Sequence, residues 1–211
     1  MKNKSIEIHK WFNKLERHSF PFNENRISNN GIYILFEKGE KFNSFDRIVR
    51  VGTHTGNNKL VSRLKEHFLN ENKDRSIFRK NIGRAFLNRE NNPFLEYWEM
   101  DLTSKQARLE LEHKVDFNLK NITESKVSDY IQNNFSFATF QINEKNKRVY
   151  FEKKLISTIS LCSDCNPSKD WLGNFSTKDK IRKSGLWQVN ELWKDSISDT
   201  EMEELRLILK V

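Results

Sequence analysis

Apolar residues along this chain change from helical spacing to short continuous runs and back again. Residues 5–17 have the three- and four-residue spacing of an amphipathic helix. Two runs of β-branched, aromatic and aliphatic residues follow, over 32–36 and 47–52, and each predicts a strand. The polar stretch 39–44 separates them, so we expect a hairpin with a long loop.

Helical spacing returns after this hairpin. A third run, dense in aromatic and β-branched residues, lies over 134–142 and suits a buried strand. The expected helices lie over 58–70, 76–87, 148–161, 178–183 and 199–209. Residues 90–134 are polar and mostly helical in pattern, and we expect them to pack against the main unit through Leu109, Leu111, Val115 and Leu119.

Composition adds a basic charge to this picture. Lys and Arg number 37 against 29 Asp and Glu, which gives a formal charge of +8 and a pI near 9.4. This charge favours a polyanionic partner, and it is equally compatible with a merely basic soluble protein. With only seven Gly and three Pro there is no flexible linker, so we expect one domain over 1–211.

The chain shows no targeting or membrane pattern. No apolar run approaches the roughly 20 residues of a membrane span, and the start lacks the apolar core of a secretory signal. We therefore expect a cytoplasmic location and no membrane partner. Cys162 and Cys165 form a C-x-x-C pair, but a structural zinc needs two more ligands, so we expect reduced structural thiols.

Glu152 is a carboxylate on an apolar helix face. Leu155, Ile156 and Ile159 share that face, and burying an unpaired carboxylate costs several kcal/mol. Two interpretations remain open from this helix alone. Glu152 either binds a metal ion or pairs with Arg148, one turn away.

Tyr33, Arg63 and His67 are the other candidates for chemistry. Tyr33 follows Gly31 at a strand start, where the missing side chain permits close approach to the phenol. Arg63 and His67 lie one turn apart at the edge of an apolar stripe, and a guanidinium and an imidazole both suit a phosphate. The structural alternatives are a packed tyrosine, an Arg63 paired with Glu66, and a histidine at the core edge.

Four motifs together resemble the GIY-YIG nuclease family. They are Gly31-Ile32-Tyr33, Arg50-Val51-Gly52, Arg63-Leu64-Lys65-Glu66-His67 and Glu152-Lys153-Lys154-Leu155-Ile156. The resemblance implies an α+β fold with a small three-stranded antiparallel sheet flanked by helices. Within it, 90–134 would be a helical insertion and 162–211 a C-terminal helical extension.

The same resemblance implies site roles. Tyr33 corresponds to the first-motif tyrosine, Arg63 to the helix arginine and Glu152 to the glutamate that binds Mg²⁺ or Mn²⁺, with His67 orienting Tyr33 or the phosphate. Gly31, Gly52 and His54 would support the site.

The chain departs from the family pattern at the second motif. Arg50 stands where the family has a tyrosine, so the role of that phenol is either absent or taken over by Arg50 or His54. Asn166 and Asn174 are candidates for a family asparagine that follows the glutamate, and their spacing does not choose between them.

The resulting expectation is a divalent-metal-dependent DNA endonuclease of a restriction or defence type. A non-catalytic nucleic-acid-binding module and a repair-type incision nuclease are the alternatives. Double-strand cleavage would need two protomers, as in a homodimer, or sequential binding. Candidate phosphate contacts are Arg79, Lys80, Arg84, Lys178, Lys180, Arg182 and Lys183, with Trp171 and Trp187 as candidate stacking residues; a solvated basic face and core tryptophans are the alternative.

Overall fold

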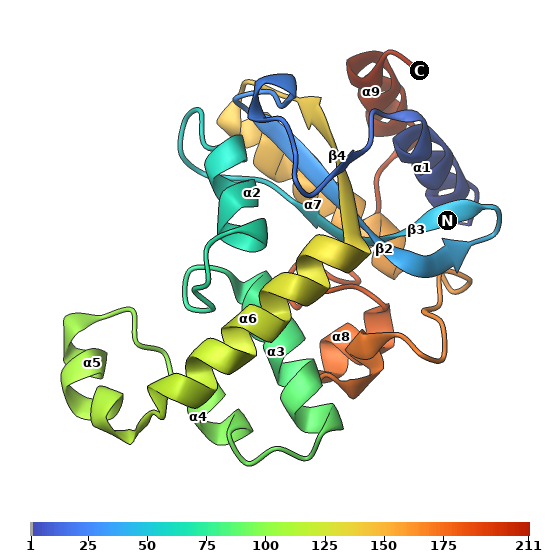
Figure 1. Cartoon of the computed structure of the whole chain (residues 1–211). Helices are drawn as coiled ribbons and strands as arrows, with labels where there is room; N and C mark the ends of the chain where they lie inside the picture. The colour runs from blue at the N-terminus through green and yellow to red at the C-terminus, as the bar shows by residue number, and fades with distance from the viewer. Residues whose placement is uncertain (1) are drawn as a thin grey trace.

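The computed structural model describes residues 2–211, with side chains from residue 4 onward. Its sheet is antiparallel, as expected, but has four strands rather than three, in the order β1-β4-β2-β3 (Figure 1). The strands are β1 (His18–Ser19), β2 (Gly31–Phe42), β3 (Phe45–Gly52) and β4 (Phe135–Gln141). β1 contributes only two residues at the free side of β4. Such a short strand leaves no alternating pattern in the sequence, which is why the prediction missed it.

The β2–β3 hairpin is tighter than predicted. β2 continues through residues 37–42, so that only Asn43 and Ser44 connect it to β3. Asn43 has φ 54°, the left-handed conformation that Asn tolerates and that two-residue hairpins need. The long loop expected from the polar residues at 39–44 was therefore wrong, because Glu40 is buried within β2, where its carboxylate pairs with Arg47 of β3.

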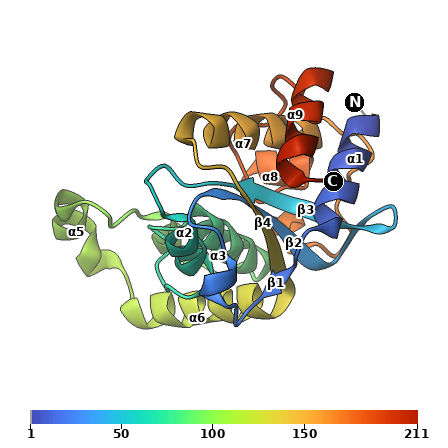
Figure 2. The same cartoon turned by 90° about the horizontal axis from the view of Figure 1, so that it is seen from above.

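Helices cover both faces of the sheet (Figure 2). One face carries α1 (Lys2–Lys14), α7 (Lys145–Ser160) and α9 (Asp199–Leu209), and the other carries α2 (Leu60–Phe68), α3 (Ile77–Arg89) and α6 (Phe117–Asn134). Strand alternation sorts β2 between these layers. Ile32, Ile34 and Phe36 pack in the cluster with α1 and α7. Tyr33 and Leu35 pack in the cluster with α2, α3 and α6.

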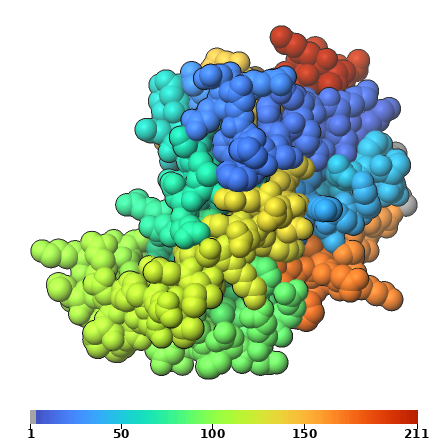
Figure 3. Space-filling model, viewed as in Figure 1, coloured from blue at the N-terminus to red at the C-terminus, as the bar shows by residue number. Residues whose placement is uncertain are grey.

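The segment predicted as an insertion has two different parts. Its outer part contains α4 (Leu95–Glu99), α5 (Lys105–Leu111) and the 3₁₀ turn Glu112–Lys114, and α5 projects from the body of the molecule (Figure 3). Leu109 is 70% exposed and Leu119 is 40% exposed, so the predicted buried face was wrong there, although Val115 is buried. The second half of α6 brings Val127 and Ile131 into the core before β4.

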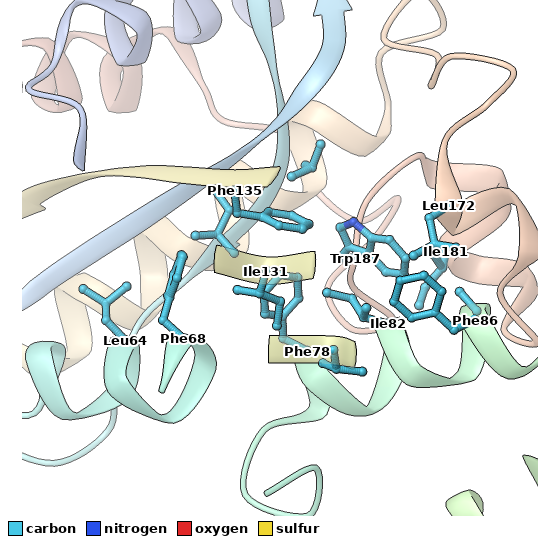
Figure 4. Packing of buried hydrophobic residues seen from close by; sticks show 14 of the residues in the cluster. Leu64, Phe68, Phe78, Ile82, Phe86, Ile131, Phe135, Leu172, Ile181 and Trp187 are labelled. Atoms are coloured by element: carbon cyan, nitrogen blue, oxygen red, sulfur yellow. The ribbon is translucent and has the colours of Figure 1, made fainter. Parts of the chain in front are cut away.

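The C-terminal segment also enters the core. It contains the 3₁₀ helix Leu172–Phe175 and α8 (Asp179–Ser184), while a further 3₁₀ turn, Glu24–Arg26, precedes β2. Leu172, Ile181 and Trp187 lie among the side chains of α3 (Figure 4). Trp171 and Trp187 donate their indole N–H groups to Glu37 Oε2 at 2.7 and 2.8 Å. Both tryptophans are core residues, which fits the structural alternative to base stacking.

Two further sequence expectations bear on cysteines and membranes. Cys162 and Cys165 are free thiols, and burial raises the pKa of the Cys165 thiol above its ordinary value. Within residues 2–211, none of the helices combines the length and the apolar character that a bilayer crossing requires.

Candidate active site

Tyr33 is the centre of a buried polar group beneath the sheet. Its side chain points toward α2 because Tyr33 lies on the α2–α3–α6 face of β2, and it is 1% exposed. There, the Tyr33 Oη lies 2.8 Å from His67 Nε2, and the two rings meet edge to face at 5.4 Å. The structure thus brings together the first-motif tyrosine and the helix histidine.

Arg50 lies on the same face as Tyr33, next to a β-bulge in β3. Leu35 pairs with Arg50, but the next residue Phe36 pairs with Ile48, so Val49 is an extra residue in β3. Arg50 lies opposite Leu35, with its Nε donating to Tyr33 Oη at 3.4 Å. Its Nη1 donates to the carbonyl oxygen of Trp187.

The two motif glycines make room for close contacts. Gly52 pairs with Tyr33 across the hairpin, and a Cβ there would lie 2.2 Å from Tyr33 Oη. A Cβ on Gly31 would lie 2.2 Å from the carbonyl oxygen of Phe140 in β4. Gly52 therefore accommodates the phenol, whereas Gly31 accommodates the neighbouring strand.

Arg63 borders both the phenol and an open pocket. Its Nη1 donates to Glu66 Oε2 at 2.6 Å and to the carbonyl oxygen of Arg75 at 3.0 Å, so the pair with Glu66 forms. Burial alone would lower the pKa of Arg63, but its interactions with Tyr33 and Glu66 raise it. The guanidinium stays charged beside Tyr33.

The pocket next to Arg63 has a volume of about 450 Å³. Its lining consists of Thr53, His54, Thr55, Gly56, Lys59, Ser62, Arg63 and Glu66. With Lys59 and Arg63 on its wall and several hydroxyl groups, it suits an anion such as a phosphate group.

Glu152 reaches this region from the opposite helical layer. Its Oε1 accepts a hydrogen bond from the backbone N–H of Thr53, the first residue after β3, at 2.9 Å. The alternative pairing with Arg148 does not occur within the described chain, since that guanidinium donates instead to the carbonyl oxygens of Ile142 and Asn143. Glu152 and Tyr33 thus approach the same end of β3 from the two faces of the sheet.

The surroundings of Glu152 combine burial with positive charge. Burial raises the pKa of Glu152 on balance, although Arg50, the Thr53 N–H and Arg63 oppose that rise. Among residues 2–211 no cluster of three or more His, Cys, Asp or Glu side chains is placed to hold a metal ion. A single carboxylate oxygen still fits Mg²⁺, which retains several waters and commonly uses one or two carboxylates together with substrate phosphates.

His54 fastens the loop that follows β3. Its Nε2 accepts the backbone N–H of Gly31 at 3.3 Å and its Nδ1 donates to the carbonyl oxygen of Gly56 at 2.7 Å. The Thr53 hydroxyl donates to the carbonyl oxygen of Gly31 at 2.7 Å. Both His54 ring nitrogens are engaged by backbone, so this side chain shapes the pocket wall rather than offering a free nitrogen.

The basic residues predicted to contact nucleic acid divide into two groups. On α3, Arg79 is fully buried and pairs with Glu124 at 2.8 Å, while Arg84 is buried and pairs with Glu99. Lys80 is also buried and donates to the carbonyl oxygen of Glu99 at 2.8 Å. This burial argues against phosphate contacts by all three. The α8 group is exposed: Lys178, Lys180, Arg182 and Lys183.

The remaining residues of interest are the two candidate asparagines and two residues whose roles at the site were not predicted. Asn166 and Asn174 donate to carbonyl oxygens of their own loop, at Ser163 and at Ser168 and Lys169. Sequence reasoning missed Ser76, whose Oγ lies 2.7 Å from His67 Nδ1, and Trp187, whose carbonyl holds Arg50. Ser76 carried one signal, because Ser before an apolar-periodic run is typical of an N-cap. Trp187 carried none.

One of three comparisons with known proteins gives a match. A family model described as GIY-YIG domain matches residues 13–210, which is nearly the whole chain. The comparison with curated proteins gives no match. The comparison with solved structures gives none either.

Proposed function

Because the chain belongs to the GIY-YIG domain family, whose members are generally endonucleases, we propose that it is a divalent-metal-dependent endonuclease that hydrolyses DNA phosphodiester bonds. The observation that carries the proposal is the convergence at the end of β3. There Tyr33 contacts His67 and Arg50, and Glu152 binds the N–H of Thr53. A phenol, two guanidinium groups and a carboxylate suit proton transfer, charge neutralisation and metal binding.

Each side chain then has one task. Tyr33 accepts or relays the proton of the attacking water, and His67 holds the phenol in place. Arg63 neutralises charge on the phosphate from the pocket wall. Arg50 takes over the place of the second-motif phenol as a second cation beside Tyr33. Glu152 would hold Mg²⁺ or Mn²⁺, which when bound supplies Lewis-acid stabilisation of the phosphate and the leaving oxygen.

The exposed lysines of α8 are proposed to bind DNA phosphates outside the site. Lys178 and Lys180 line a second pocket together with Ile77 and Val189. Ile77 follows Ser76, which contacts His67, and Val189 follows Gln188, whose Oε1 accepts the Val51 N–H at 2.9 Å. Chain segments that hold the site therefore continue directly into the α8 surface.

Cleavage of plasmid DNA tests the proposal. We expect nicking of plasmid with Mg²⁺ or Mn²⁺ and none with EDTA. The substitutions Tyr33→Phe, Arg63→Ala and Glu152→Ala should each reduce the rate by about a hundredfold or more, on the order of 3 kcal/mol. Lys194→Ala is the matched control, because Lys194 forms an exposed pair with Glu191. Retained cleavage in Glu152→Ala would remove the metal assignment.

The kind of DNA that is cleaved distinguishes the remaining functional alternatives. Cleavage of intact plasmid supports a restriction or defence role, whereas cleavage of only nicked or branched duplex supports repair. Salt-sensitive binding without any cleavage would show a non-catalytic module instead. One such site cuts one strand, so linear product in a single encounter would require two protomers.

A further inference from the structure

The buried histidines of this protein differ in what faces their ring nitrogens. In His9 and in His54, Nδ1 lies 2.7 Å from a backbone carbonyl oxygen, and Nε2 lies 3.2 or 3.3 Å from a backbone N–H. A carbonyl only accepts and an N–H only donates. Both rings are therefore Nδ1–H tautomers, fixed by their backbone partners.

His67 instead lies between two hydroxyl groups. Its Nδ1 is 2.7 Å from Ser76 Oγ and its Nε2 is 2.8 Å from Tyr33 Oη. Burial lowers the pKa of His67 well below its ordinary value of 6.5, and the charges of the neighbouring arginines lower it further. The neutral ring offers one donor and one acceptor, so the two hydroxyl protons compete for a single lone pair.

Ser76 has the stronger need for that lone pair. It is fully buried, and its Oγ already accepts the N–H of Arg79 as the N-cap of α3. Within the described chain, His67 Nδ1 is the one acceptor that its hydroxyl proton reaches. An orphaned buried hydroxyl costs about 1–3 kcal/mol. The Tyr33 oxygen, by contrast, faces the Nε of Arg50 and interacts with Arg63. It therefore has cationic partners even when the His67 lone pair is directed at Ser76.

We propose that Ser76 is a positioning residue that holds His67 as the Nε2–H tautomer, so that His67 donates a hydrogen bond to Tyr33 Oη rather than taking its proton. Tyr33 Oη then accepts N–H donors from His67 and from Arg50, and these two donors orient the phenolic oxygen.

This assignment rests on the proposed hydrolysis and gives its proton a path. The oxygen of water bonds to phosphorus, and its proton passes to Tyr33 Oη, which gives up its own proton to solvent. The bond from phosphorus to the leaving oxygen breaks, and that oxygen takes a proton from solvent. His67 remains neutral and donating throughout, and Ser76 keeps it in that form.

The tautomer is measured directly by long-range ¹H–¹⁵N correlation spectra of the full-length protein with labelled histidine. We expect His67 to show a protonated Nε2 and a bare Nδ1. His9 and His54 should show the opposite pattern in the same spectrum and act as internal references, and the His67→Gln spectrum assigns the signals. A protonated Nδ1 on His67 in the wild-type protein overturns the proposal. This readout needs no cleavage, so an inactive protein would refute the proposed function and leave the tautomer assignment to be decided on its own.

Two substitutions connect the tautomer to catalysis. Ser76→Thr keeps both a cap and a hydroxyl, so the His67 pattern and cleavage should persist. Ser76→Asp keeps a good cap but only accepts, so His67 should gain a proton on Nδ1 and cleavage should fall about tenfold or more. Wild-type cleavage by Ser76→Asp with a protonated Nδ1 and a bare Nε2 on His67 would overturn the catalytic part. If Ser76→Asp does not fold, the wild-type spectrum still decides the tautomer.

Discussion

The basic side chains of α3 and α8 look alike in sequence and differ completely in the folded protein. Arg79 on α3 is enclosed with Glu124, its side chain 0% exposed and that of Glu124 2% exposed. Lys180 on α8 is exposed and forms no ion pair among the residues that the structure describes. The first charge belongs to the core of the molecule, and the second is available to a partner.

This difference shows what a count of positive charges leaves out. A guanidinium donates through a planar fork, so it is the cation that proteins bury against a carboxylate and several oxygens. Arg79 also donates to the carbonyl oxygen of His67 and to Ser128 Oγ. The lysines of α8 have no comparable enclosure. Although all of these residues count toward the +8 formal charge, Arg79 and Arg84 are neutralised internally, whereas the α8 lysines remain for polyanions.

The largest expected effect is the loss of stability on removing the buried cation. Arg79→Met leaves the buried Glu124 carboxylate without its cation, with only the backbone N–H of Lys73 still donating to it, which should lower the free energy of unfolding by about 3–5 kcal/mol in urea titrations. Lys180→Met is the matched control on α8 and should change it by less than about 0.5 kcal/mol.

A double substitution sharpens this test. Arg79→Met combined with Glu124→Leu removes both buried charges, so it should recover part of the stability that Arg79→Met alone removes. Equal destabilisation by Arg79→Met and Lys180→Met would contradict the distinction between a buried, paired cation on α3 and an exposed cation on α8.

The second effect concerns DNA binding by α8. Replacing Lys178, Lys180 and Lys183 by Gln should weaken binding to duplex DNA about tenfold, or about 1.4 kcal/mol. The slope of log affinity against log salt should become shallower by about 0.9 for each DNA phosphate that the variant no longer neutralises. Binding is measured with EDTA present so that cleavage does not interfere.

A matched triple substitution controls for net charge. Lys10, Lys14 and Lys38 are also exposed, and changing them to Gln removes the same charge from α1 and β2. Binding should then change far less. Equal weakening by the two triple variants would show that only overall charge matters, and the proposed role of α8 in DNA binding would be withdrawn.

Much of the fold could be predicted from spacing. α9 begins and ends where its pattern predicted, at Asp199 and Leu209, because its capping box and apolar stripe are local signals. β1 and the bulge at Val49 could not be foreseen, since neither leaves a periodic signal. Arg50 reaches Tyr33 through the regular pairing of residues 50–52 with residues 33–35, which puts both side chains on one face.

The candidate site was also predictable only in part. Tyr33, Arg63, His67 and Glu152 were selected from motifs, and the structure brings them to one end of β3. Ser76 and the Trp187 carbonyl act through contacts between different elements, at separations of 9 and 137 residues from His67 and Arg50. No pattern within one element reports such contacts. The burial of Arg79 and Arg84 could not be foreseen for a related reason, because their carboxylate partners, Glu124 and Glu99, lie on other helices, α6 and α4.

The smallest expected effect is the change in the free energy of unfolding as the pH falls. It is compared between one ion pair of α3 and one ion pair of α8. Burial would raise the pKa of Glu99, but its hydrogen bonds with Arg84 and the charge of Arg84 outweigh burial and lower it below 4.5. A carboxyl whose pKa is lower in the folded state stabilises that state above the unfolded value, and the contribution disappears as the pH falls through the folded value. Because 35% of the Glu99 side chain is exposed, solvent screening should limit it to about 1 kcal/mol or less.

Urea titrations of Glu99→Gln from pH 7 to pH 3 measure this contribution. The variant should be less stable than the wild-type protein at pH 7, and the difference should shrink as the pH falls through the lowered folded-state pKa of Glu99, below which Glu99 is protonated in both states of the wild type. Asp179→Asn, which breaks the exposed Asp179–Arg182 pair of α8, should change stability by less than about 0.5 kcal/mol throughout. A pH-independent difference for Glu99→Gln would assign its effect to packing rather than to the charge of the pair, and would remove Arg84 from the internally neutralised group.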